Sequence, residues 1–187
     1  MKELLKQIIF EQQDNCRHLM QDAIPRHIEE EWLTTTEILI ITGVRRCGKS
    51  VLLQQLRDKL EEKDFFFNFD DERLDGLDTA QLNDVLEVLY KIYGSFQYIF
   101  LDEIQNIEGW PLFVNRLLRN KMHVVLTGSN AKLLSSDLAT HLTGRSSEIE
   151  LYPFSFVEYC KMKGVNTSSR TTKAIAELRN CFDEYMK

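Results

Sequence analysis

Two kinds of hydrophobic pattern alternate along the chain. Short apolar runs, typical of strands buried on both faces, lie at 37–43, 64–71, 97–103, 123–129 and 147–154. Between them, apolar residues recur at helical spacing over 49–62, 79–94, 110–121 and 131–142. A capping box of Ser155 and Glu158 then predicts a helix that runs to Gly164. Alternating strands and helices predict an α/β fold in which a parallel sheet lies between two helical layers.

The two ends of the chain differ from this core, which we place at residues 37–164. Residues 1–36 have a helical pattern and are expected to form a helical cap over the sheet. Residues 165–172 are a polar linker, and the segment after them aligns its apolar residues on one face of a helix. A lone amphipathic helix is marginal in water. We therefore expect either that 165–187 begins a helical lid in a truncated chain, or that the last helix packs back on the core.

Composition narrows the class of protein. With 187 residues, 43% of them hydrophobic, the chain is long enough for one domain with a sizeable core. The formal net charge of -6 gives no support to binding of nucleic acid or anionic lipid. No apolar run reaches the roughly 18 residues that a membrane span needs. The four cysteines lie far apart without metal-binding spacing, as expected for free thiols in a reducing compartment. These features predict a cytoplasmic protein that does not contact a membrane.

The stretch "GVRRCGKS" at residues 43–50 matches the phosphate-binding pattern G-x-x-x-x-G-K-[ST]. Glycines let backbone N–H groups curl around phosphate oxygens, and the helix that follows directs its unpaired N–H groups at the same point. Lys49 is expected to reach the β and γ phosphates and Ser50 to ligate Mg²⁺. The alternative is an ordinary glycine-rich turn, which the strand before it and the helix after it disfavour. We expect a nucleotide site at Gly43, Val44, Arg45, Arg46, Cys47, Gly48, Lys49, Ser50 and Val51.

Three side chains inside this loop allow more than one interpretation. Arg45 and Arg46 add positive charge, which either raises phosphate affinity or pairs with surface carboxylates. Cys47 lies beside cations at a helix N-terminus, and these conditions lower the pKa of a thiol. A redox gate over the nucleotide is therefore a hypothesis for Cys47.

The strand "YIFLDE" carries two acids, Asp102 and Glu103, to its carboxyl end, the edge at which open α/β sheets bind ligands. Asp102 is expected to hold Mg²⁺, and Glu103 to polarise the water that attacks the γ-phosphate. The next strand ends in "TGSN", which contains Thr127, Ser129 and Asn130 and offers a polar tip to the γ-phosphate. The spacing favours a P-loop NTPase in which this strand separates the two motif strands, with sheet order 5-1-4-3-2.

Five segments together resemble a family of prokaryotic AAA-type ATPases that join an N-terminal ATPase domain to a C-terminal domain of unknown function. The segments are "ITGVRRCGKSVLL", "FNFDDERL", "YIFLDEIQNIEGW", "VVLTGSNAKLL" and "LTGRSSEIELYPFSFVEY". The resemblance implies that Lys49 and Ser50 belong to Walker A, that Asp102 and Glu103 form Walker B, and that Ser129 or Asn130 is a sensor. Members of the family continue well past the point where this chain stops.

The same resemblance places Arg145 where AAA proteins often carry an arginine finger, which usually serves a neighbouring subunit. That role implies a homo-oligomer. The alternative is a surface arginine paired with Glu148 or Glu150.

We therefore expect an ATP- and Mg²⁺-dependent ATPase domain of AAA type that binds ATP and ADP. A nucleotide-gated binding module with little turnover, coupled to a missing C-terminal domain and an unknown protein partner, remains as the alternative.

Overall fold

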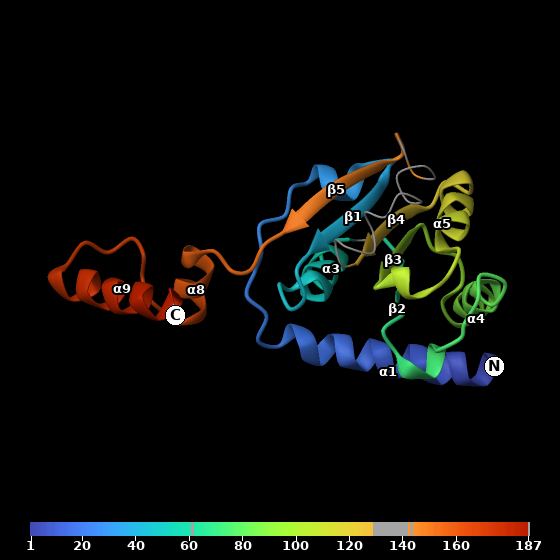
Figure 1. Ribbon diagram of the computed structural model, residues 1–187, viewed down its shortest axis with the longest axis horizontal. Coiled ribbons are helices and arrows are strands. Elements are labelled where there is room, and N and C mark those ends of the chain that lie inside the picture. The colour runs from blue at the N-terminus through green and yellow to red at the C-terminus, as the bar shows by residue number, and fades with distance from the viewer. Residues whose placement is uncertain (61, 129–141, 143, 187) are drawn as a thin grey trace.

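Five parallel strands form a single sheet in the computed structural model, which describes residues 1–60, 62–128, 142 and 144–186 (Figure 1). The strands are β1 (Ile38–Gly43), β2 (Asp64–Asn68), β3 (Tyr98–Asp102), β4 (His123–Thr127) and β5 (Ser146–Leu151). Their order across the sheet is β2-β3-β4-β1-β5. This confirms the predicted order, and β4 separates β1 from β3 as expected.

Helices cover both faces of the sheet. Successive residues of β2 point to opposite faces, so that Phe65 and Phe67 join one hydrophobic core and Phe66 joins the other. The first core also contains side chains of α1 (Lys2–Met20), α4 (Leu82–Tyr93) and α5 (Trp110–Arg119). The second contains side chains of α3 (Lys49–Arg57). The molecule therefore has the predicted three-layer α/β/α architecture.

Burial explains why two strands differ in pattern. All six residues of β1 are buried, because β4 and β5 flank this strand and helices cover it. The edge strand β5 instead alternates half-buried and exposed positions and carries Glu148 and Glu150 on its exposed ones.

Both edge strands, β2 and β5, are shorter than predicted. The chain leaves β2 for a 3₁₀ turn, η1 (Glu72–Leu74), in which the side chain of Asp71 accepts from the N–H of Arg73. It leaves β5 shortly before Pro153.

The N-terminal segment is only partly helical. Helix α1 and the short α2 (Glu31–Thr34) are present, but residues 22–29 between them are not helical, although the pattern over 1–36 indicated helix. Pro25 lacks an amide donor and restricts the residue before it, which favours extended backbone here. Helix α1 packs against α3, α4 and the edge strand β2 (Figure 1). Its Gln12 side chain bonds both backbone groups of Asn68, at 2.8 and 2.9 Å, and so covers part of that edge.

The C-terminal arm comprises α8 (Phe156–Met162) and α9 (Thr172–Tyr185). Ser155 and Glu158 form the predicted capping box at the start of α8. The two helices pack on each other through Phe156 and Phe182, whose ring centroids are 5.2 Å apart, and stand apart from the sheet (Figure 1). The last helix therefore packs on α8 and not on the core.

One helix prediction cannot be compared, because residues 131–142 lie, apart from Leu142, outside the described residues. Among the helices that the structure describes, none combines the length and the apolar character needed to cross a bilayer.

Candidate functional site

The loop between β1 and α3 depends on a glycine at each end. Gly43 has φ of 150°, and a Cβ atom there would lie 2.3 Å from the carbonyl oxygen of Leu151 and 2.8 Å from Sγ of Cys47. Gly48 has φ of 100° and is the N-cap of α3. Between them Arg46 also has a left-handed backbone, with φ of 68°. The loop therefore curls tightly into the first turn of a helix, whose free N–H groups suit an anion.

Lys49 lies buried within this loop, with only 5% of its side chain exposed. Its Nζ donates to the carbonyl oxygens of Gly43 at 3.1 Å and Val44 at 3.3 Å. A carboxylate oxygen of Glu103, Oε1, lies 3.8 Å from the same nitrogen. The ammonium group thus folds back on its own loop, where a phosphate oxygen can replace the two carbonyl groups as acceptor.

Asp102 is the last residue of β3 and is fully buried. Its Oδ1 accepts a hydrogen bond from the hydroxyl of Thr127, and its Oδ2 has no hydrogen-bond partner among the described residues. Burial raises the pKa of this carboxyl, and the hydroxyls of Thr127 and Ser50 partly offset that rise. An ionised carboxylate here therefore needs a cation to compensate its lost hydration.

The residues fit Mg²⁺ at this point. The free oxygen of Asp102 and the hydroxyl of Ser50 are hard oxygen ligands, and Mg²⁺ is commonly held by one or two protein groups together with substrate phosphates. In the described part of the chain, no group of three or more His, Cys, Asp or Glu side chains forms a complete metal site. A metal at Asp102 would accordingly depend on the nucleotide for most of its ligands.

Glu103 follows Asp102 with a left-handed backbone, at φ of 53°. Its N–H donates to the hydroxyl oxygen of Thr127 at 3.1 Å. The same hydroxyl donates to Asp102, so Thr127 holds both acids in register from the neighbouring strand. The side chain of Gln105 donates to Oε2 of Glu103. The structure thus brings Lys49, Ser50, Asp102 and Glu103 together. It places the hydroxyl of Thr127, from the predicted polar tip, against the two acids, and it adds Gln105.

The other side chains of the loop are either exposed to solvent or buried in the core. Val44, Arg45 and Arg46 are exposed, and no described carboxylate pairs with either arginine. Cys47 is 4% exposed and packs in the core that contains α3. A buried thiol that fills core space gives no support to the redox gate.

Arg26 is a site residue that the sequence analysis missed. Its side chain is 8% exposed and joins three segments. It donates to the carbonyl oxygens of Cys47 at 3.3 Å and Tyr152 at 2.7 Å, and its Nε lies 2.9 Å from Oε1 of Glu158. The glycine loop, the end of β5 and the first turn of α8 are therefore linked through one guanidinium group. The only signal in the sequence was a single arginine after Pro25, and nothing near it indicated which residues it would contact.

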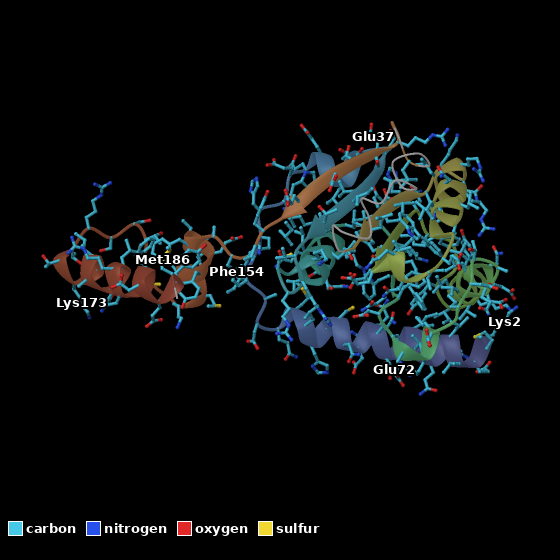
Figure 2. All side chains as sticks on the ribbon, in the orientation of Figure 1. Lys2, Glu37, Glu72, Phe154, Lys173 and Met186 are labelled. Carbon is cyan, nitrogen blue, oxygen red and sulfur yellow. The ribbon has the colours of Figure 1, made fainter. Side chains whose placement is uncertain are left out.

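An apolar cavity of about 240 Å³ adjoins the loop at Gly48 and Val51. Phe154, which lies where the chain leaves the sheet for the arm (Figure 2), is one of its lining residues. The other lining residues are Leu19, Asp22, Ala23, Ile24, Arg26 and Met162. Its mostly apolar lining suits a largely apolar group placed beside the loop.

The other predicted site residues lie outside the described residues or away from the loop. Ser129 and Asn130 lie outside the described residues. Arg145 immediately precedes β5, and its carbonyl accepts from Ile38 at the start of β1. Since Gly43 lies five residues along β1, Arg145 is roughly 17 Å from the loop, at the opposite end of the strands. Its exposed side chain donates to Asn115 at 3.3 Å, whereas Glu148 accepts from Thr42.

Comparison with known proteins supports the fold and identifies the family. Residues 35–160 match the family described as AAA domain. An uncharacterized protein of Methanocaldococcus jannaschii is 36% identical over 97% of this chain, and an uncharacterized protein of Haemophilus influenzae is 42% identical over 73% of it. The matched regions span 42% and 36% of those two relatives.

Among solved structures, the Hsp104–ADP complex of S. cerevisiae matches 81% of this chain and 23% of its own, at 17% identity and a TM-score of 0.51. At that identity the likeness concerns the fold alone. The family match, however, covers both β1 with its glycine loop and β3 with its two acids. The chain therefore belongs to the AAA-type P-loop ATPase family.

Proposed function

We propose that this chain binds ATP together with Mg²⁺ and hydrolyses it by in-line attack of water on the γ-phosphate. One observation carries the proposal: a fully buried carboxylate, Asp102, has an oxygen without a hydrogen-bond partner among the described residues, at the sheet edge that also holds the glycine loop and Lys49. Such an oxygen is explained by a cation, and a cation beside a phosphate-binding loop is explained by a nucleoside triphosphate.

Different groups of the chain bind the phosphates, the metal, the attacking water and the base. Loop N–H groups and Lys49 hold the phosphates, and Lys49 exchanges its bonds to Gly43 and Val44 for bonds to phosphate oxygens. Mg²⁺, held by Ser50, Asp102 and phosphate oxygens, would draw off negative charge that builds during transfer. Glu103 orients the attacking water. The apolar cavity beside Gly48 takes the base.

Replacing Lys49 with Met tests the phosphate site. Lys49→Met keeps an unbranched side chain but removes the ammonium group. We expect the Kd for Mg²⁺-ATP to rise about 10- to 100-fold, because a hydrogen bond to a charged group contributes roughly 1.5–3 kcal/mol. Titration calorimetry with the wild type, with and without EDTA, measures both this loss and the dependence on Mg²⁺.

Lys59→Met is the matched control, since Lys59 is exposed just beyond the end of α3. This variant should bind as the wild type does. Equal ATP affinity in Lys49→Met and the wild type, or wild-type binding and turnover indifferent to EDTA, would contradict the proposed function.

A second candidate function has its own supporting observation. Arg26 links the loop at Cys47 to the first turn of α8 through Glu158. Loop movement on nucleotide binding would therefore reach the C-terminal arm. This favours a nucleotide-gated module that presents the arm to a protein partner, with turnover incidental. The two functions differ in whether turnover is required.

We also propose that Arg145 acts on the nucleotide of a neighbouring copy in a homo-oligomer. Its position at the amino end of β5, away from its own glycine loop, and its exposure support a role outside its own subunit. Arg145→Ala should bind ATP normally but turn it over about 10- to 1,000-fold more slowly. Mixing it with inactive Glu103→Gln should restore activity, because mixed interfaces pair an intact arginine with an intact glutamate.

ATPase assays of each variant alone and of their mixtures check this role. Wild-type turnover by Arg145→Ala alone would rule it out. Activity of the mixture equal to the average of its components would assign any effect of Arg145 to its own subunit.

A further inference from the structure

We propose that Gln105 is a positioning residue that holds Glu103 in the orientation needed to direct water. Gln105 lies in η2 (Ile104–Asn106), the short 3₁₀ turn that follows Glu103. The inference rests on the proposed function, since it concerns the same carboxylate. It assigns a role to a side chain whose hydrogen bond within the described residues goes to Glu103.

The backbone of Glu103 is fixed, but its side chain has a choice of partners. The left-handed conformation and the N–H bond to Thr127 set where Cα lies. Beyond Cα, Oε1 faces the ammonium group of Lys49 and Oε2 accepts from Nε2 of Gln105. The carboxylate is therefore held between a cation on one side and a neutral amide on the other.

These two contacts will respond differently to nucleotide. Nζ of Lys49 is 3.8 Å from Oε1, which is beyond hydrogen-bond distance, and this group turns to the phosphates when ATP binds. The contact with Gln105 is made by the other carboxylate oxygen, Oε2, and does not involve Lys49, so it can survive that change. One oxygen then stays anchored by the amide while Oε1 becomes free to accept from water. Fixing the rotamer in this way keeps a general base within reach of its proton.

The other end of the Gln105 amide argues against a packing role. Its Oε1 is buried without a hydrogen-bond partner among the described residues, and an unsatisfied buried acceptor destabilises a fold. An apolar side chain of similar length would fill the same space without that penalty. What Gln105 supplies that Met lacks is the Nε2 donor to Glu103.

Two substitutions separate the donor from the shape. Gln105→Met keeps length and removes the amide, and Gln105→Glu keeps the shape but presents only acceptors to Glu103. We expect kcat for Mg²⁺-ATP to fall about 10- to 100-fold in Gln105→Met, and at least as far in Gln105→Glu, because small misplacement of a catalytic group has effects of this order. The Kd for ATP should change less than about twofold, since neither variant alters a phosphate contact.

Thermal unfolding and a second background complete the test. Gln105→Met should unfold at the wild-type temperature or above it. Gln97→Met is the matched control, because Gln97 is an exposed glutamine that immediately precedes β3, and it should keep wild-type kcat. In a Glu103→Gln background, Gln105→Met should lower kcat no further, because Gln105 acts only through Glu103.

Several results would overturn the inference. These are wild-type kcat in Gln105→Met or in Gln105→Glu, a full additional loss in the Glu103→Gln background, or a fall in kcat matched by weaker ATP binding. If the wild type bound Mg²⁺-ATP without turning it over, the proposed hydrolysis would fail and this role with it. Wild-type turnover with an unaffected Gln105→Met would remove the positioning role alone.

Discussion

Glu103→Gln should lower kcat for ATP hydrolysis by about 10²- to 10⁴-fold, the range expected for loss of a positioned general base. The amide keeps the size of the side chain and its place beside Gln105, but it no longer accepts a proton from water. Lys49, Ser50 and Asp102 are untouched, so the Kd for Mg²⁺-ATP should stay near the wild-type value. Single-turnover hydrolysis together with equilibrium binding measures both quantities.

Glu108→Gln is the matched control, because Glu108 is an exposed acid a few residues further along the chain. It should leave kcat and Kd unchanged. Equal kcat in Glu103→Gln and the wild type would remove Glu103 from the mechanism. The variant also separates the two candidate functions: a biological output that survives Glu103→Gln favours the nucleotide-gated module, and one that disappears while ATP binding persists requires turnover.

The sheet could be predicted because its signals are local or follow from general rules. The apolar run that forms β1 ends at a glycine, and the apolar run that forms β3 ends at two acids. The carboxyl end of each strand can therefore be recognised from the sequence. Right-handed crossovers between parallel strands then leave few possible orders. The break in the N-terminal helical pattern has a local signal too, Pro25, which the overall apolar pattern obscured. The ends of β2 and β5 were less predictable, since pairing at a sheet edge decides where a strand stops.

The site was predictable only where residue type and spacing define chemistry. Lys49, Asp102 and Glu103 come from motifs whose spacing in sequence fixes their place in space. Arg26 acts through bonds to residues far along the chain, and a single arginine carries no sign of its partners. The strand end "TGSN" indicated that Thr127 lies at the nucleotide edge, but not that it bonds to both acids. Arg26 donates to Tyr152, 126 positions away. Such contacts emerge from packing of the layers and not from any local pattern.

Gly43→Ala is expected to have the largest structural effect of any single methyl group added at the site. The new Cβ would lie 2.3 Å from the carbonyl oxygen of Leu151, the residue that Gly43 pairs with across β1 and β5. The nearest atoms are the backbone of Leu151 and the buried Sγ of Cys47, so no flexible side chain is there to give way. Alanine is also unfavourable in the left-handed backbone conformation of Gly43. Because of the overlap and the backbone strain together, we expect the free energy of unfolding to fall by about 2–4 kcal/mol.

The same overlap should abolish nucleotide binding before it unfolds the protein. To relieve it, β1 must move away from β5 where the loop begins, and this displaces the carbonyl groups and N–H groups that shape the phosphate site. ATP affinity should fall on the order of 100-fold or more at temperatures where circular dichroism still shows folded protein, because several phosphate contacts are lost together. Urea unfolding and calorimetry measure the two effects.

Gly76→Ala isolates the cost of backbone conformation, because Gly76 has φ of 76° and a Cβ there would meet nothing within 4 Å. That variant should lose about 1–2 kcal/mol and bind ATP normally. The difference in free energy of unfolding between Gly43→Ala and Gly76→Ala reports the cost of the close approach of β5 to the start of the loop. If Gly43→Ala were no less stable than Gly76→Ala and bound ATP as well, the tight junction between β1, β5 and the phosphate site would be wrong, and with it the reason that only glycine serves at the first position of the loop.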